Sequence, residues 1–184
     1  SELRVDGGAC VNDLLMQYPD SRVVDEASLY LAEATLGGGL YEDARRMFEK
    51  VYRLNFSSST RCRAAYGLGR CAYEQGDLPE AQQWLTQAID MTEEAEDARL
   101  GTAYYLLGRV CVQQKNYEMA SRAFRAALEK RLSNDEYFEV TAALIRSKIS
   151  ERRYIEAMEL LESIPEPRLS QEQTCEVMLI RSRI

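Results

Sequence analysis

An internal repeat constrains the fold of this chain more than any other feature of its sequence. The heptapeptide ALIRSKI at residues 143–149 returns thirty-five residues later as MLIRSRI at residues 178–184. Self-similarity at such a period indicates a stacked array of helical units, in which each unit contacts only its neighbours. The inner surface of such an array can accommodate another chain, so the sequence favours binding over catalysis.

Four small residues at regular spacing define the repeat, because each opens the second helix of a unit. They are separated by 37, 39 and 37 residues: Ala44, Ala81, Ala120 and Ala157. An aromatic residue or a leucine precedes each alanine by three residues: Tyr41, Leu78, Tyr117 and Tyr154. An apolar residue follows each alanine by four residues: Phe48, Leu85, Phe124 and Leu161. Offsets of three and four residues mark one face of an α-helix, so we predict that these faces pack against the first helix of each unit.

Earlier in each unit a leucine is followed by a second residue that is small in the first three units and bulkier in the last two. The pairs are Leu31-Ala32, Leu68-Gly69, Leu107-Gly108, Leu144-Ile145 and Leu179-Ile180. A small residue allows close backbone approach. We therefore predict that the two helices of a unit touch closely at this pair.

The combined pattern resembles the tetratricopeptide repeat (TPR), a helix-turn-helix motif with a Leu-Gly pair, a Gly-Asp-Tyr-like turn, an alanine and an aromatic residue. The second full unit fits best, at Leu68-Gly69, Gly76-Asp77-Leu78, Ala81, Leu85 and Ala88. The resemblance implies an all-α fold, a right-handed α-solenoid of stacked antiparallel helix pairs with about four full repeats and a half repeat at each end. We expect one array over residues 1–184, with units at 1–21 (partial), 22–57, 58–94, 95–133, 134–167 and 168–184 (partial).

Both ends of the sequence have the pattern of half units. Residues 9–18 resemble a closing helix, and residues 170–184 resemble an opening helix without its partner. The apolar stretch 177–180 lies close to the C-terminus, whereas a terminal repeat normally has a polar outer face. We therefore expect a fragment of a longer array. The alternative is that residues 170–184 cap the array.

The composition disfavours several kinds of catalytic and metal site. The sequence contains no histidine, so triads that require an imidazole base cannot form within it, and the usual zinc clusters are disfavoured. Gly67 and Gly69 lie within a helical pattern, whereas a phosphate-binding loop requires a strand before its glycines. We therefore expect a protein that is not an enzyme and that needs no cofactor or metal.

Cysteine usage and a second resemblance bear on the compartment. The five cysteines include no Cys-x-x-Cys pair: Cys10, Cys62, Cys71, Cys111 and Cys175. Most stand on apolar helix faces, so we interpret them as buried free thiols, which suit a reducing cytoplasm. A weaker resemblance links Tyr18-Pro19-Asp20-Ser21 and Tyr41-Glu42-Asp43-Ala44 to TPR proteins of the bacterial cell envelope, of the outer-membrane assembly lipoprotein or Tol-Pal coordinator type. Cytoplasm and bacterial periplasm both stay open.

The sequence contains no apolar run of the roughly eighteen residues that a membrane span requires. We therefore expect no direct membrane insertion, and we expect no targeting segment.

An arginine directly follows the leucine-containing pair in every unit from the second full unit onward. These residues are Arg70, Arg109, Arg146 and Arg181. One helical turn earlier, two of these units carry Tyr66 and Tyr105. In the TPR family these two positions face the inner groove, so the resemblance implies a partner-binding groove formed by the six residues. A tyrosine ring can cover apolar parts of a peptide while a guanidinium binds its carboxylate. Alternatively, the arginines are solvated or pair with nearby acids, such as Glu74 one turn after Arg70.

The first full unit departs from this pattern. It has Glu33 at the arginine position and Leu29 at the tyrosine position, so the predicted basic groove begins in the second unit. TPR proteins that bind the C-terminal carboxylates of chaperones use lysine, asparagine and arginine. The matching positions here are Leu29 with Glu33, Gly67, and Thr102 with Leu106. We therefore expect no binding of chaperone tails.

The sequence thus predicts a non-catalytic scaffold that binds an extended or helical, acidic segment of a protein partner in its groove. The alternative is a structural spacer or oligomerisation module that associates through the array ends, with Leu179 and Ile180 exposed at one of them. Helical arrays of this period can also read RNA, but a net charge of −7 opposes binding to phosphates. We expect a protein or peptide partner and no nucleic acid.

Overall fold

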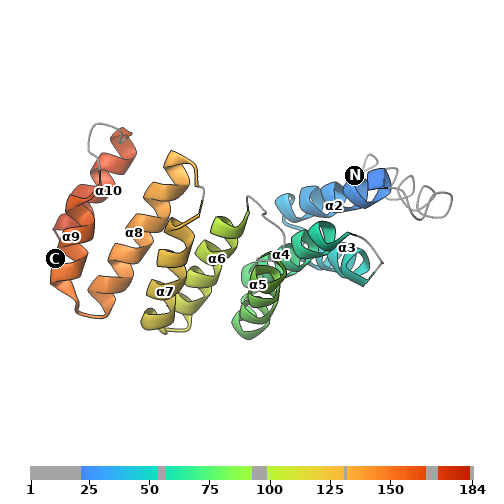
Figure 1. Cartoon of the computed structure of the whole chain (residues 1–184), viewed down its shortest axis with the longest axis horizontal. Coiled ribbons are helices and arrows are strands. Elements are labelled where there is room, and N and C mark those ends of the chain that lie inside the picture. Colours follow the sequence, from blue (N-terminus) through green and yellow to red (C-terminus); the bar gives the residue numbers. More distant parts are fainter. Residues whose placement is uncertain (1–21, 54–56, 93–98, 131, 165–169, 183–184) are drawn as a thin grey trace. The chain divides into compact units, whose positions relative to one another are not determined.

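The computed structural model describes residues 22–53, 57–92, 99–130, 132–164 and 170–182. Over these ranges the chain forms nine α-helices and no strand, so the predicted all-α class is confirmed (Figure 1). The helices are α2 (Arg22–Gly37), α3 (Tyr41–Arg53), α4 (Ser58–Gln75), α5 (Leu78–Thr92), α6 (Leu100–Gln113), α7 (Tyr117–Leu128), α8 (Asn134–Ser150), α9 (Tyr154–Glu162) and α10 (Gln171–Arg181). None of them is both long enough and apolar enough to cross a membrane. The closing helix expected at residues 9–18 lies outside the described residues.

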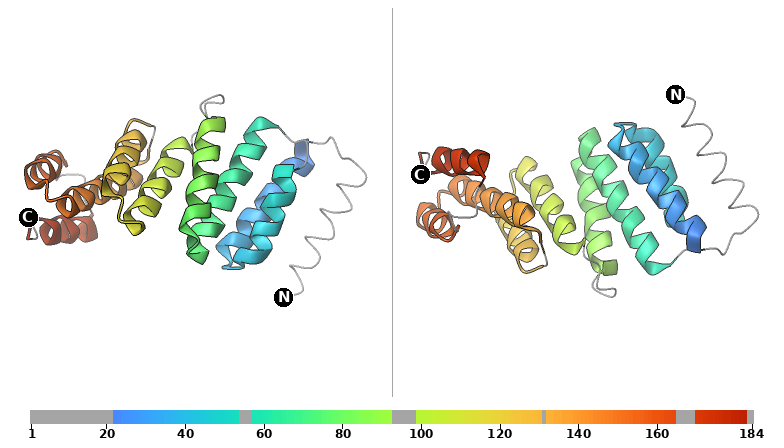
Figure 2. Two further views of the ribbon diagram at one scale, coloured as in Figure 1. Left: turned by 90° about the horizontal axis from the view of Figure 1, so that it is seen from below. Right: turned by 90° about the horizontal axis from the view of Figure 1, so that it is seen from above.

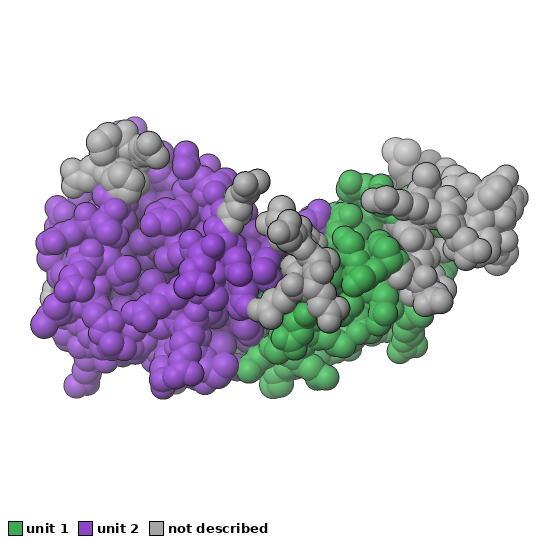
Figure 3. Space-filling model, in the orientation of Figure 1, with its two compact units in different colours: residues 1–97 green, residues 98–184 purple. Residues whose placement is uncertain are grey.

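The helices belong to two compact units, residues 1–97 and residues 98–184 (Figure 3). In unit 1 each of the helices α2 to α5 packs against the next, and α2 also contacts α4. In unit 2 each of the helices α6 to α9 packs against the next, α6 contacts α8, and α10 contacts α8 and α9. Figure 2 shows the helices of each unit side by side in two further views. Contacts between successive first helices are what a stack of helix pairs requires.

The anchor residues lie where the sequence pattern predicts. The second helices α3, α5, α7 and α9 begin at the aromatic residue or leucine of each unit: Tyr41, Leu78, Tyr117 and Tyr154. The four alanines are fully buried: Ala44, Ala81, Ala120 and Ala157. The apolar residues four positions later are buried as well: Phe48, Leu85, Phe124 and Leu161. The predicted helix faces and their pairing are therefore confirmed.

Glycines allow the two helices of a pair to touch closely in α4–α5 and in α6–α7. A Cβ atom added to Gly69 would lie 2.8 Å from Leu85 Cγ, and one added to Gly108 would collide with the Phe124 ring. A larger side chain at either position would have to displace a buried neighbour, which overpacks the core. The close approach predicted at the Leu-Gly pair is thus confirmed for both helix pairs.

The pair α8–α9 reaches the same contact with different residues. Ile145 occupies the glycine position and is fully buried in an apolar cluster with Phe138, Ala157 and Leu161. Leu161 stands where α7 has the larger Phe124. A bulkier residue on the first helix therefore meets a smaller one on the second, so the pair fills its core without glycine.

Each turn within a helix pair contains one residue in the left-handed backbone region. These residues have φ values of 76°, 81°, 62° and 61° at Gly39, Gly76, Lys115 and Arg152, respectively. Their spacing equals that of the buried alanines. Glycine adopts this conformation without steric cost, whereas a residue with a Cβ loses about 1 kcal/mol there. The sequence analysis identified the glycine turn at Gly76 and did not identify the equivalent positions in unit 2.

The cysteines follow the expectation in part. Cys62, Cys71 and Cys111 are buried free thiols, as predicted, whereas Cys175 on α10 is exposed. Burial raises the pKa of Cys71 to about 11, and it also raises the pKa of Cys111. Both thiols therefore stay protonated at neutral pH and are poor nucleophiles. Cys10 lies outside the described residues.

The orientation of α10 corrects one expectation of the sequence analysis. Val177 and Ile180 are buried in the cluster that α10 shares with α8 and α9. Ile180 is therefore not exposed at the array end, although the sequence analysis placed it there. Leu179 and Met178 are 61% and 64% exposed. Cys175 lies two residues before Val177, which places it on the opposite side of the helix and explains its exposure.

Candidate partner-binding surface

The four predicted arginines occupy one position of successive first helices. Arg70, Arg109, Arg146 and Arg181 lie on α4, α6, α8 and α10, and all four are exposed. Each follows a buried residue, and because successive residues of an α-helix are turned by about 100°, the arginine turns away from the core. Arg70 belongs to unit 1 and the other three belong to unit 2. Within the described residues of unit 1, Arg70 forms no ion pair with Glu74.

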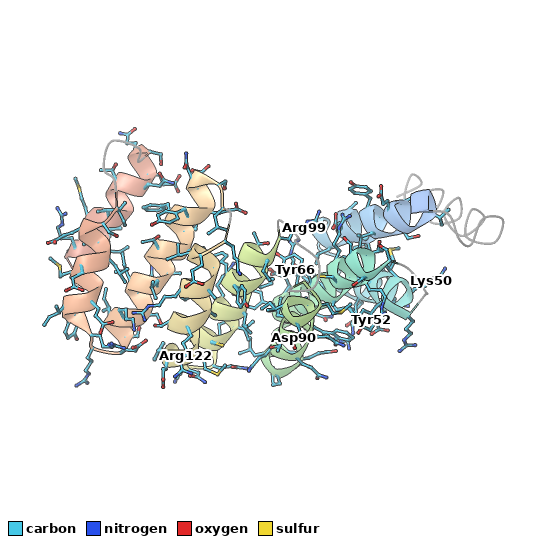
Figure 4. All side chains as sticks on the ribbon, viewed as in Figure 1. Lys50, Tyr52, Tyr66, Asp90, Arg99 and Arg122 are labelled. Carbon is cyan, nitrogen blue, oxygen red and sulfur yellow. The ribbon has the colours of Figure 1, made fainter. Side chains whose placement is uncertain are left out.

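Two of these arginines lie over the tyrosine that precedes them by one turn. The Cζ atom of Arg70 is 5.9 Å from the centroid of the Tyr66 ring, and the Cζ atom of Arg109 is 5.9 Å from that of Tyr105 (Figure 4 labels Tyr66). Such a cation–π contact contributes about 0.5–1 kcal/mol at an exposed site, which favours one placement of the guanidinium. The Tyr105 ring also contacts the buried Phe124, with ring centroids 6.0 Å apart. The contact with Phe124 thus fixes the position of the Tyr105 ring against the core.

The other two arginines have no tyrosine one turn earlier on their own helix. Buried Ala142 and Val177 stand one turn before Arg146 and Arg181, respectively. Because α8 contacts both α6 and α10, Arg109, Arg146 and Arg181 come from neighbouring first helices of unit 2. Unit 2 therefore carries a tyrosine–arginine contact on α6 and an exposed arginine on each of α6, α8 and α10.

The first full repeat contributes a tyrosine, and the second repeat an arginine, that the sequence analysis missed. Leu29 is fully buried, so the tyrosine position of this repeat faces the core. The next residue, Tyr30, is 59% exposed, and the Cζ atom of Arg63 on α4 lies 5.4 Å from its ring centroid. Arg63 Nη2 also donates a hydrogen bond to Glu33 Oε1 at 3.2 Å. The three-residue spacing of Tyr30 and Glu33 indicates that both lie on the same face of α2. Their shared partner, Arg63, could not be found from this spacing because it lies on α4.

A buried polar network lies elsewhere, at the junction of α7, α8 and α9. Lys148 is 2% exposed, and its Nζ lies 3.2 Å from Glu151 Oε2 and 3.6 Å from Glu156 Oε2. Ser121 Oγ donates a hydrogen bond to Glu151 Oε1 at 2.6 Å. Burial acts to raise the pKa of Glu151, but hydrogen bonds from Ser121 and Lys148 and the charge of Lys148 hold it below its usual value.

The members of this network satisfy one another, so the network joins three helices and presents no unpaired acid or base for catalysis. Within the described ranges, no group of three or more cysteine, aspartate or glutamate side chains is arranged to hold a metal ion.

A family model settles the classification. The tetratricopeptide repeat model matches residues 23–94 and again residues 60–133, which together are more than half of the chain. The chain belongs to the tetratricopeptide repeat family. TPR arrays are typically non-catalytic scaffolds that bind protein or peptide partners on their stacked helices. None of the curated proteins matches the sequence.

Solved structures share this TPR fold at low sequence identity. BtubC (BKLC) from P. vanneervenii has a TM-score of 0.73 and 14% identity, over 98% of this chain and 82% of BtubC. YrrB, a TPR protein described as having an unusual peptide-binding site, has a TM-score of 0.70 and 17% identity, over 94% of this chain and 82% of YrrB. The apo form of RapI has a TM-score of 0.72 and 11% identity over 82% of this chain, which spans 58% of RapI. Identities this low establish the fold alone.

Proposed function

We propose that this TPR protein binds an acidic segment of a partner protein through the exposed faces of its first helices. The observation that carries the proposal is the recurrence of an exposed arginine on α4, α6, α8 and α10, stacked on tyrosine in two of these helices. The proposed contact residues are Tyr66, Arg70, Tyr105, Arg109, Arg146 and Arg181. As in other TPR scaffolds, no step of catalysis is involved.

Charge and shape both support an acidic partner. The chain has a net charge of −7, so a recurring arginine on one helix position reverses the sign of the charge locally. A guanidinium has a planar fork of donors that matches a carboxylate, and charge-assisted hydrogen bonds of this kind are stronger than neutral ones. The half-buried tyrosine ring beneath offers an apolar face at little entropic cost. The peptide-binding site named for YrrB supports a peptide segment as the partner.

A titration with an acidic peptide tests this function. The probe is a fluorescein-labelled peptide of alternating glutamate and leucine, and its anisotropy is measured across a salt series. We expect the double variant Arg70→Gln/Arg109→Gln to weaken binding by about tenfold, because it removes one charge-assisted contact from each unit. High salt should weaken binding of the wild-type protein as well.

The matched control is Arg46→Gln/Arg122→Gln. It also removes one arginine from each unit, but from the second helices α3 and α7, where both side chains are about three quarters exposed (74% and 75%) (Figure 4 labels Arg122). We expect this variant to retain the wild-type affinity. Equal loss in both variants would show that only net charge matters.

Peptide binding that neither variant weakens would refute the proposed contact residues. The second candidate function, a structural spacer or oligomerisation module that associates through the array ends, predicts concentration-dependent association that does not depend on the arginines. That function is supported by the exposed Met178 and Leu179 of α10.

A further inference from the structure

Arg63 links the two first helices of unit 1, α2 and α4, because it already forms an ion pair with Glu33 of the same chain. It reaches from α4 to α2, where its Nη2 donates to Glu33 Oε1 at 3.2 Å and its Cζ lies 5.4 Å from the centroid of the Tyr30 ring. The Tyr30 ring is 59% exposed. Arg63 thus repeats, between two helices, the arginine-on-tyrosine contact that Arg70 and Tyr66 make within one helix.

These contacts share one face of unit 1. Arg63, Tyr66 and Arg70 follow one another at offsets of three and four residues, so they lie in a row along α4. Tyr30 and Glu33, three residues apart on α2, meet the first member of that row. The face therefore presents two tyrosine rings, each with an arginine over it, and a glutamate that neutralises one of the two arginines.

The Arg63–Glu33 pair leaves part of the guanidinium unsatisfied. Among the described residues, Glu33 accepts one hydrogen bond from Arg63, whereas arginine and a carboxylate commonly form two parallel ones. Arg63 Nε is buried and has no acceptor within the part of the chain that the structure describes. The two side chains are 16% and 28% exposed, so the pair lies at the margin of the surface. Once Glu33 has moved away, a partner carboxylate can accept from Arg63 Nη2 in its place.

We propose that Glu33 is an internal competitor for Arg63, and that an acidic partner segment bound at Tyr66 and Arg70 continues onto α2 by displacing Glu33 and covering Tyr30. Charge complementarity selects the occupant: the partner supplies a carboxylate where the chain now supplies its own. The displaced Glu33 side chain turns into water, which its partial exposure permits. This inference rests on the proposed function, because it extends the binding surface from α4 to α2.

If Glu33 competes for Arg63, removing its charge should raise the affinity for the acidic peptide. Glu33→Gln keeps the size of the side chain and removes its charge, so Arg63 no longer has to give up an ion pair. We expect the glutamate-leucine peptide to bind about two- to fivefold more tightly, the equilibrium equivalent of a partly exposed ion pair. The gain should vanish in Glu33→Gln/Arg63→Gln, because the competed arginine is then absent.

The matched control for the change in net charge is Asp90→Asn, which removes one negative charge from an exposed residue of α5 in the same unit (Figure 4 labels Asp90). It should leave the affinity near the wild-type value. Fluorescence of Trp84 on α5 and thermal melts of each variant check that unit 1 stays folded.

The outcomes separate this inference from the proposed function. If Arg70→Gln/Arg109→Gln loses binding but Glu33→Gln binds like Asp90→Asn, the proposed function stands and the competition is refuted. A gain that persists without Arg63 also refutes it. If neither the wild-type protein nor Glu33→Gln binds the peptide at low salt, both proposals are wrong.

Discussion

Units 1 and 2 build the same helix pair with different residues in its turn. The left-handed position is Gly39 or Gly76 in unit 1, whereas it is Lys115 or Arg152 in unit 2. A residue with a Cβ loses about 1 kcal/mol in this conformation, and unit 2 adopts it twice. Packing of the two helices must therefore outweigh the preference of the turn residue. The comparison teaches that in this repeat the helix contact dictates the turn.

The last helix pair of unit 2, α8–α9, closes differently from the α4–α5 pair of unit 1. In unit 1, α4 and α5 meet through Gly69 against Leu85. At the end of unit 2, α8 and α9 meet through Ile145, beside the buried Lys148 and its partner Glu151. An apolar contact tolerates small changes gradually, whereas a buried ion pair is stabilising only while both charges are present. Unit 2 is therefore expected to be more sensitive to the loss of a single charged residue.

The largest effect is expected from breaking that ion pair. Glu151→Ala leaves the ammonium of Lys148 buried, with Glu156 at 3.6 Å. We expect a loss of about 3 kcal/mol in the free energy of unfolding, because the buried ammonium loses its nearer carboxylate and keeps only the more distant one. Urea denaturation followed by circular dichroism measures this loss.

Thiol labelling assigns the effect to a unit. Cys111 of unit 2 should become reactive sooner in Glu151→Ala, while Cys71 of unit 1 should keep its wild-type rate; equal acceleration at both would contradict the assignment. The control Lys148→Met/Glu151→Leu replaces the pair with apolar side chains. It should lose less than half as much stability, since no unpaired charge is left.

A smaller effect is expected at the glycine contact of α6 and α7. In Gly108→Ala the new methyl group meets the Phe124 ring, and the overpacking outweighs the better helix propensity of alanine. We expect a net loss of about 1 to 2 kcal/mol in the free energy of unfolding. A second substitution, Phe124→Leu, should recover part of the lost stability, because it places on α7 the smaller side chain that Leu161 provides at the same position of α9.

Gly37→Ala is the control for that variant, because no atom lies within 4 Å of a Cβ added there. It should leave the melting temperature unchanged or raise it slightly. A drop as large as that of Gly108→Ala would mean that helical glycines matter for a reason other than close packing.

The smallest effect is expected in the turns, where the comparison began. Lys115→Gly should stabilise unit 2 by up to about 1 kcal/mol, because glycine relieves the left-handed strain. The reverse change, Gly76→Ala, should destabilise unit 1 by a similar amount. Thermal melts compare the two variants, and a loss of stability in Lys115→Gly would refute the view that packing imposes strain on this turn.

Most of the fold was predictable because its signal is periodic. Tyr41, Leu78, Tyr117 and Tyr154 lie on the helices of the buried alanines, since a three-residue offset places a residue one turn earlier on the same helix; they begin these helices, which the sequence analysis started at the alanines. The contact of Arg70 with Tyr66 follows from the same geometry, because residues four apart are neighbours on a helix. The use of this pair for binding stays a prediction.

The errors and omissions concern residues whose surroundings come from other helices. Repeat alignment placed Ile180 at an exposed end, but the rotation of α10 against α8 and α9 buries it. Lys148 was overlooked because lysine is rarely buried, and only its partners on neighbouring segments make burial possible. Arg63 was overlooked because its tyrosine and glutamate lie on α2 and its own backbone lies on α4.

The sequence by itself determined the helices, their order, the positions where a pair closes and the recurrence of arginine, since all of these depend on spacing along one helix or on a repeated period. The tertiary structure alone decided which helix a side chain reaches: Arg63 to Glu33, Lys148 to Glu151, and Ile180 into the core instead of solvent. Such contacts depend on how far one helix is rotated and shifted against its neighbour. That rotation is set by the summed packing of many side chains, and no local pattern in the sequence encodes it.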